Sequence, residues 1–139
     1  MPGPDEPGDR PEAGADPRAV ALSYVASFAT GDPDRIAAHV SDDFVNEHAA
    51  ALGSGCTGRA EYRRRLPGFL ADFAGLRYDP DDIIVEGTKV VVPYRLTATH
   101  DGHPIDLRGV FVLRITDGQI THRTDYWDAL TFLHQTGSP

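Results

Sequence analysis

The chain has 139 residues, of which 40% are hydrophobic and 24% are charged, proportions that are ordinary for one globular domain. It has no apolar run of about 20 residues, no apolar N-terminal signal segment and only one cysteine, Cys56, so we expect a cytoplasmic protein without membrane spans or internal disulfides. The net charge of -8 repels a phosphate backbone, so nucleic acid is not an expected partner.

Residues 1–17 differ in composition from the rest of the chain. They contain five prolines, three glycines and five acidic residues, but no leucine, isoleucine, valine or aromatic residue. Such a segment cannot bury enough apolar surface to offset the entropy lost on ordering. We therefore predict a disordered acidic tail over 1–17, with a binding arm as the alternative, and one folded domain over 18–139.

The first half of that domain has helical periodicity. Asp16-Pro17 is a helix-start signal, and the apolar spacing that follows predicts an amphipathic helix over 17–30. Asp32-Pro33 repeats the signal and predicts a short helix that carries Ile36 and Val40, broken by residues 41–43.

A short strand and a third helix are expected next. Phe44 to Asn46 predicts the strand, and the small residues from Ala49 to Gly58 predict a loop. The helix follows and carries Tyr62, Leu66, Phe69, Leu70 and Phe73 on one side, with a kink or split at Pro67.

After Gly75 the chain becomes rich in β-branched and aromatic residues. Strands are predicted at 83–85, 90–99, 105–115 and 120–127, with one further helical stretch over 128–134. Asp101-Gly102 and Asp117-Gly118 are signals for tight antiparallel hairpins. The order indicates an α+β fold with three N-terminal helices gathered on one side of a bent sheet.

Neither a phosphate loop nor metal-ligand spacing is present. The histidines lie at 39, 48, 100, 103, 122 and 134, without the spacing of a metalloprotease, and one cysteine gives no zinc-finger pattern. We therefore expect no metal and no organic cofactor.

Three stretches resemble a known family. They are Asp43-Phe44-Val45-Asn46 with His48, then Thr99-His100 with Leu107 to Val110, and finally Arg114 to Ile120 with Asp125 to Asp128. Together they resemble the SnoaL-like polyketide cyclases of the nuclear transport factor 2-like superfamily, over roughly residues 18–137. The resemblance implies a cone-shaped barrel in which a curved, mixed or antiparallel sheet wraps around the helices and encloses a cavity.

The resemblance also implies site residues. In these cyclases an Asp of the last strand is the general acid/base, and the matching position is Asp125. An Asn of the first pocket strand holds the substrate, which corresponds to Asn46. The cyclases use a His where this chain has Phe111. Limonene-type epoxide hydrolases of the same superfamily are a further alternative, in which Arg95 matches a catalytic Arg but Thr97 replaces its partner Asp.

The residue pattern is consistent with proton transfer at Asp125. Strand alternation places Arg123, Asp125 and Trp127 on one face, and burial of that face would raise the pKa of the carboxyl group. A base of raised pKa suits proton transfer at neutral pH. A surface position, or an ion pair with Arg123 or Arg95, is the alternative for Asp125, because strand alternation around Pro93 leaves the direction of Arg95 open.

Two residues are candidates to act beside Asp125, and six to bind the substrate. Asn46 and His48 share a strand face and, like the Tyr24 hydroxyl, can donate to a developing oxyanion. The predicted substrate-binding residues are Tyr24, Phe28, Arg95, Phe111, Arg123 and Trp127.

These residues predict a small-molecule enzyme that acts on an apolar carbonyl compound, such as a polyketide or steroid, by cyclisation, isomerisation or dehydration. The main alternative is a non-catalytic protein that binds an apolar ligand in the same cavity, and an interaction module is a third possibility. The central strands are partly apolar on both faces, with Val91 and Pro93 on the side that the helices leave uncovered. We therefore expect a homodimer through the convex face of the sheet.

Overall fold

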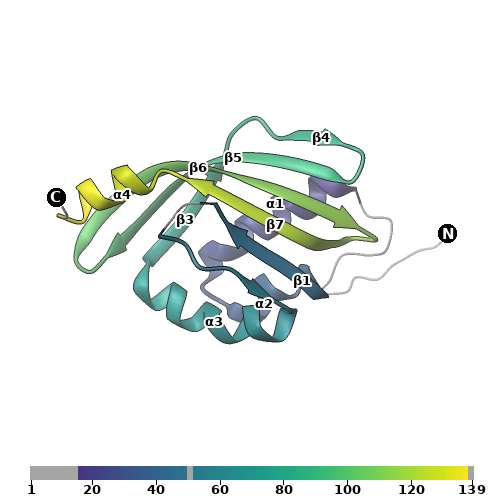
Figure 1. Cartoon of the computed structure of the whole chain (residues 1–139), viewed down its shortest axis with the longest axis horizontal. Coiled ribbons are helices and arrows are strands. Elements are labelled where there is room, and N and C mark those ends of the chain that lie inside the picture. The colour runs from purple at the N-terminus through teal and green to yellow at the C-terminus, as the bar shows by residue number, and fades with distance from the viewer. Residues whose placement is uncertain (1–15, 50–51, 138–139) are drawn as a thin grey trace.

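The structure is a computed structural model that describes residues 16–49 and 52–137. The predicted tail lies outside the described residues except for Asp16 and Pro17. The helices are α1 (Pro17–Ser27), η1 (Phe28–Thr30), α2 (Pro33–Ala37), α3 (Arg59–Asp72) and α4 (Ala129–Gln135). The strands are β1 (Val40–His48), β2 (Cys56–Thr57), β3 (Ala74–Pro80), β4 (Ile84–Glu86), β5 (Lys89–His100), β6 (His103–Thr116) and β7 (Gln119–Trp127) (Figure 1).

The two Asp-Pro signals start helices as predicted. The Asp16 carboxylate accepts a hydrogen bond from the Arg18 backbone N–H at 3.2 Å, and Asp32 accepts from that of Asp34 at 3.0 Å. Gly31 then turns the chain with a φ of 67°, a conformation that glycine adopts without strain.

The first strand begins earlier than the sequence predicts. Val40 was expected on the short helix, but it starts β1 and pairs with Ile120 of β7. Val40 and Ile120 are both fully buried, so pairing with a distant strand prevails over the local pattern. The expected break at residues 41–43 is therefore wrong.

Two further local predictions are corrected. Pro67 does not split α3, which runs without interruption from Arg59 to Asp72. The segment after Gly75 holds a strand that the sequence analysis missed, β3, in which Leu76 and Tyr78 are buried. Its alternation is too short to stand out in the sequence, and its pairing with the long strand β5 stabilises it.

The strands form one sheet in the order β2-β1-β7-β6-β5-β3, with β4 paired to β5 beside this path. The pair β1–β7 is parallel, and all other pairs are antiparallel. The predicted Asp-Gly hairpins are present: Asp101 and Asp117 have φ of 51° and 53°, and Gly102 and Gly118 have φ of 79° and 75°. The sheet is therefore mixed, and it does not close into a barrel.

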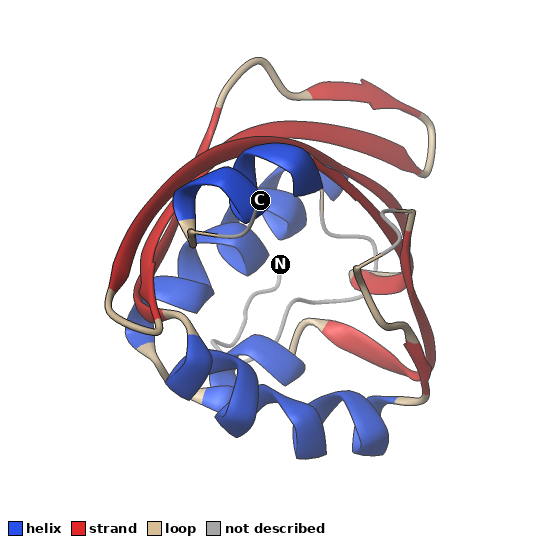
Figure 2. Ribbon diagram, turned by 60° about the vertical axis from the view of Figure 1, so that its left-hand side comes forward, coloured by secondary structure: helices blue, strands red, loops and turns tan. Residues whose placement is uncertain are grey.

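The sheet is strongly curved and the helices lie on its concave side (Figure 2). Alternate residues of β5 point to the two faces: Val92, Tyr94 and Leu96 are buried on the concave side. The predicted α+β class, with a curved sheet around N-terminal helices, is confirmed. None of the described helices is long and apolar enough to cross a membrane.

The convex face is less well covered. Val91 and Pro93 of β5 and Val110 and Val112 of β6 are partly buried, and Tyr126 of β7 is 51% exposed. The helices do not reach this side of the sheet (Figure 2). The predicted dimer through this face remains a prediction.

Candidate active site

A cavity of about 660 Å³ lies between the concave face of the sheet and the helices. This volume is within the range of small-molecule sites, about 300–1,000 Å³. Most of the wall is apolar and comes from α3, α4 and the central strands, including Leu66, Phe69, Leu107, Trp127 and Phe132. The cavity can therefore accept a mainly apolar ligand.

Asp125 lies in the wall of this cavity. It is 4% exposed, and its Oδ1 accepts a hydrogen bond from the Tyr94 hydroxyl at 2.6 Å. Burial raises the pKa of the carboxyl group, while the charge of Arg123 and the Tyr94 hydrogen bond oppose that rise. The structure thus gives Asp125 one fixed donor and a pKa above its ordinary value.

His48 is next to Asp125 on the parallel neighbouring strand. Its Nδ1 is 3.7 Å from Asp125 Oδ2, which is too long for a hydrogen bond. Burial, and then the charge of Arg123, lower the pKa of His48 to about 4, so the imidazole is neutral at neutral pH. His48 Nδ1 and Trp127 Nε1 are buried and have no hydrogen-bond partner among the described residues.

Arg123 is the buried cation of the site. It is 5% exposed, and its Nε donates to Asn46 Oδ1 at 2.8 Å while Nη1 donates to Tyr24 Oη at 3.0 Å. Tyr24 in turn shares a 2.6 Å hydrogen bond with Tyr62. The guanidinium lies 4.9 Å from the centre of the Phe111 ring, a cation–π distance.

The predicted site residues therefore separate into two groups. Asn46, His48, Arg123, Asp125 and Trp127 line the cavity together. So does Phe28, at the helical side.

Three other predicted residues do not line it. Tyr24 and Phe111 are fully buried behind Arg123 and support it. The prediction that Arg95 binds substrate in the cavity is wrong about its position: it lies exposed on the opposite face, where its Nε donates to Asp106 Oδ1 at 2.8 Å. Its neighbours Tyr94 and Leu96 point inward, so strand alternation turns Arg95 outward.

The sequence analysis missed Tyr94 and Gly109. Tyr94 shares the buried face of β5 with Val90 and Val92, and its hydroxyl holds Asp125. Gly109 pairs with Tyr94 across β5 and β6, and a Cβ there would lie 2.5 Å from Tyr94 Cζ. Only glycine leaves room for this tyrosine to reach Asp125. The signal in the sequence was a glycine inside a strand that is otherwise rich in β-branched residues.

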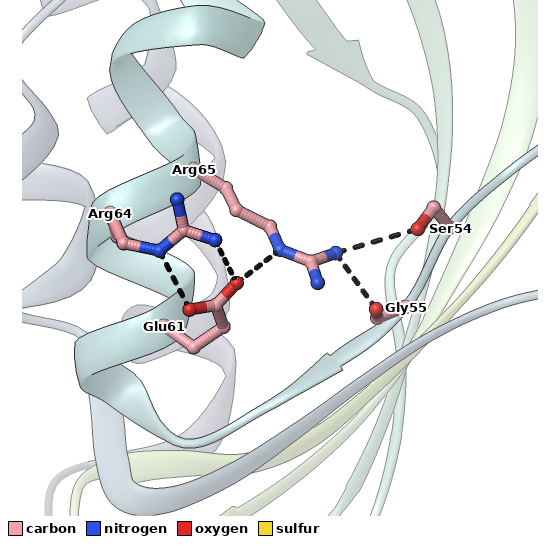
Figure 3. Close-up of polar contacts among 5 residues, drawn as sticks. All are labelled: Ser54, Gly55, Glu61, Arg64 and Arg65. Carbon is pink, nitrogen blue, oxygen red and sulfur yellow. Dashed lines mark hydrogen bonds and ion pairs between the residues drawn. The ribbon is translucent and has the colours of Figure 1, made fainter.

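Charged residues of α3 stand at the rim of the cavity. Arg64 and Arg65 line it and share one carboxylate: Arg64 Nε donates to Glu61 Oε1 at 2.8 Å and Arg65 Nε to Oε2 at 2.7 Å. Arg65 Nη1 also donates to the Gly55 carbonyl at 2.9 Å, which ties the helix to the loop before β2 (Figure 3). Among the described residues no three His, Cys, Asp or Glu side chains are grouped as metal ligands.

The fold agrees with the comparisons to known proteins. The family model for the SnoaL-like domain matches residues 21–123, and the chain therefore belongs to the SnoaL-like family. No curated protein sequence matches the chain significantly.

Solved structures with this fold are numerous, at low sequence identity. A Catenulispora acidiphila protein with a ketosteroid isomerase-like fold, in complex with trimethylamine, is 19% identical, covers 86% of this chain and 93% of its own, and has a TM-score of 0.79. TerC, co-crystallised with polyporic acid, is 23% identical over 88% of this chain and 98% of its own, with a TM-score of 0.76. A candidate polyketide cyclase of Xanthomonas campestris is 24% identical over 87% and 96%, with a TM-score of 0.71.

Proposed function

We propose that this protein is a small-molecule enzyme that moves a proton within an apolar carbonyl compound, with Asp125 as the general acid/base. The observation that carries the proposal is a carboxyl group that is 4% exposed, faces a largely apolar cavity and is held by the Tyr94 hydroxyl at 2.6 Å. Membership of the SnoaL-like family, and the fold it shares with a candidate polyketide cyclase, support a cyclase-type role.

The chemistry starts with proton abstraction. The Asp125 carboxylate takes a proton from the carbon next to the substrate carbonyl, and the electron pair of the broken C–H bond moves to the carbonyl oxygen as an enolate. Because burial raises the pKa of Asp125, its carboxylate is a stronger base than a solvated one. Protonated Asp125 then returns the proton to another carbon in an isomerisation, or to the alkoxide formed by an intramolecular aldol attack.

Deuterium exchange tests this role without knowledge of the natural substrate. Wild-type protein in deuterated buffer should accelerate exchange beside the carbonyl in a panel of fused-ring ketones headed by β-tetralone, followed by NMR. Asp125→Asn should lose this acceleration by about 100-fold or more. The matched control is Asp106→Asn, which removes an exposed carboxylate on the far face of the sheet and should exchange at the wild-type rate.

The same experiment separates the two candidate functions. Wild-type exchange that survives in Asp125→Asn would refute catalysis by this residue. Ketones that quench the fluorescence of Trp127, the only tryptophan, without any exchange would select the non-catalytic binding protein. Phe111, at the position of the cyclase His, is the feature that favours this second function, because it brings no second titratable group to Asp125.

The epoxide hydrolase alternative lacks support from the geometry. In those hydrolases an Arg at the position of Arg95 acts with the last-strand Asp, but Arg95 is exposed on the convex face with Asp106 as its partner.

The homodimer through the convex face is part of the proposal, because Val110, Val112 and Tyr126 leave an apolar surface there. Light scattering that gives a monomer mass would refute the dimer.

A further inference from the structure

The unusual feature of the cavity is that its buried arginine makes no direct ion pair with a carboxylate of the described residues. None of the ion pairs among residues 16–49 and 52–137 involves Arg123. Its hydrogen bonds go instead to the neutral acceptors Asn46 Oδ1 and Tyr24 Oη. A buried charge is costly unless it is paired, and buried charges in proteins are normally paired.

Arg123 also has donors to spare on the cavity side. A guanidinium carries five N–H donors, and the hydrogen bonds to Asn46 and Tyr24 use Nε and Nη1. The Nη2 group makes no hydrogen bond to a described residue, and Arg123 lines the cavity. Of the three oxyanion donors expected from the sequence, Asn46, His48 and Tyr24, two bind Arg123 and so position it: Asn46 and Tyr24.

The titratable groups around Asp125 define the charge of the buried end of the cavity. They come from every element packed against it: Tyr24 of α1, His48 of β1, Tyr62 of α3, Tyr78 of β3, Tyr94 of β5 and Arg123 of β7. Burial raises the pKa of all four tyrosines, and the pKa of His48 is about 4, so these five groups are neutral near neutral pH. Among the buried groups only Arg123 and Asp125 can carry a charge there, and burial raises the pKa of Asp125.

Two charge-balanced states follow from this set. With Asp125 ionised, Arg123 and Asp125 balance each other through space and the cavity suits a neutral ligand. With Asp125 protonated, the charge of Arg123 is left unbalanced at the buried end of the cavity, and an anionic ligand there restores neutrality. This second state has the charge distribution that results when Asp125 takes a proton from a carbonyl compound and leaves an enolate.

We propose that Arg123 is the oxyanion-binding group of this cavity, so that the ligands it selects are acidic enols, such as cyclic 1,3-dicarbonyls and hydroxyquinones, bound as anions opposite a protonated Asp125. This inference rests on the proposed function for its chemistry. It adds the substrate class: a carbonyl compound whose enol form ionises readily, since the guanidinium stabilises the oxygen anion directly.

A matched ligand pair tests the inference on the unmodified protein. Lawsone is an acidic hydroxynaphthoquinone that is an anion at neutral pH, and its O-methyl ether has nearly the same shape without the charge. Both quench tryptophan fluorescence, and Trp127 lines the cavity. Lawsone should bind at least about tenfold more tightly than the ether, as expected for a hydrogen bond between two charged groups. Equal affinity, or tighter binding of the ether, would overturn the inference.

Two variants test whether Arg123 supplies the positive charge that selects lawsone. Arg123→Met should abolish the preference for lawsone, and Asn46→Asp should do the same by giving Arg123 a carboxylate partner in place of the amide. The matched control is Arg64→Met, which removes a cation of the rim and should keep the preference. If Arg64→Met loses the preference while Asn46→Asp keeps it, the anion binds at the rim and the inference fails. Circular dichroism confirms that each variant is folded.

The pH dependence separates this inference from the proposed function. The affinity for lawsone should fall as pH rises, because ionised Asp125 repels the anion, and the Asp125→Asn variant should bind lawsone with a flat profile. A flat profile in the wild type would overturn the inference. If the Asp125→Asn variant binds lawsone tightly and also exchanges deuterium at the wild-type rate, the proposed function is refuted and the anion site is not.

Discussion

An exposed pair of arginines, Arg64 and Arg65 with Glu61, and the buried Arg123 with its two partners form two arginine clusters in opposite environments. On α3, Arg64 and Arg65 share the carboxylate of Glu61 at the rim of the cavity, where the Arg64 side chain is 72% exposed (Figure 3). On β7, Arg123 is 5% exposed and bonds to an amide and a phenol. Arg64 and Arg65 make short ion pairs, whereas Arg123 makes none with the residues that the structure describes.

The difference shows that contact geometry alone does not identify a functional charge. At the rim, water screens the pairs, and their effect on folding is small. In the cavity, low exposure makes the loss or gain of a hydrogen-bond partner energetically large. Burying Arg123 therefore lowers the free energy of unfolding, and the same buried charge can bind an anion. Substitutions that remove a partner from each cluster, or that disturb Tyr94 beside Asp125, should therefore differ in how far they lower the free energy of unfolding.

The largest loss of stability is expected from Asn46→Leu. This change leaves the Arg123 Nε–H buried without an acceptor, which should lower the free energy of unfolding by about 3 kcal/mol. Urea unfolding followed by circular dichroism measures it. Asn46→Asp keeps an oxygen acceptor at the same position and should lose less. A loss within about 0.5 kcal/mol for Asn46→Leu, as for an ordinary surface change, would show that Arg123 does not depend on this partner.

Gly109→Ala should cost somewhat less, about 1–3 kcal/mol, through overpacking. The new Cβ would lie 2.5 Å from Tyr94 Cζ and 2.7 Å from the Tyr126 carbonyl oxygen, so the tyrosine must move away from Asp125. Without the Tyr94 hydrogen bond, which lowers the pKa of Asp125, that pKa should rise further. The limb of the pH–rate profile that reports Asp125 should therefore move to higher pH.

Tyr94→Phe is the control for this prediction. It removes the hydroxyl that holds Asp125 and one of the atoms that the new Cβ would meet. The double variant, Gly109→Ala with Tyr94→Phe, should therefore lose less free energy of unfolding than the sum of the losses of the two single variants. Additive losses would mean that Gly109 does not act through Tyr94.

The pattern of the chain was sufficient to predict most of the fold. The Asp-Pro starts, the Asp-Gly hairpins and the period-two strands are local signals, and they lie where the structure has the corresponding elements. The exceptions depend on distant partners: Val40 joins a strand because Ile120 is beside it, and β3 exists because β5 pairs with it.

The site was predictable in part for the same reason. Family resemblance and strand alternation pointed to Asp125, Asn46 and Arg123, which the cavity brings together. What the sequence could not supply was the assignment of partners across the sheet. Tyr94 reaches Asp125 from 31 positions away, and Arg123 reaches Tyr24 from 99 positions away. Hydrogen bonds of that range depend on register and curvature, which no local pattern encodes.

The smallest effect is expected at the rim, from Glu61→Gln. Hydrogen bonds from Arg64 and then Arg65 lower the pKa of Glu61 to about 2. A carboxyl group whose pKa is lower in the folded state adds stability above its unfolded pKa of about 4.3, and that contribution disappears as the pH falls through the folded value. Glu61→Gln should therefore melt slightly below the wild type at neutral pH, with the gap closing between about pH 4 and pH 2.

Salt and acid together distinguish the rim pair from the buried cluster. Raising the ionic strength should shrink the Glu61→Gln difference, because exposed charges are screened, and should leave the Asn46→Leu loss unchanged. Calorimetric melting at several pH values and two salt concentrations measures both. If Glu61→Gln lowers stability as much as Asn46→Leu, or if its effect does not change with pH and salt, then exposure is not what separates the two arginine clusters. Their difference would then have to come from the neutral or charged nature of the partners themselves.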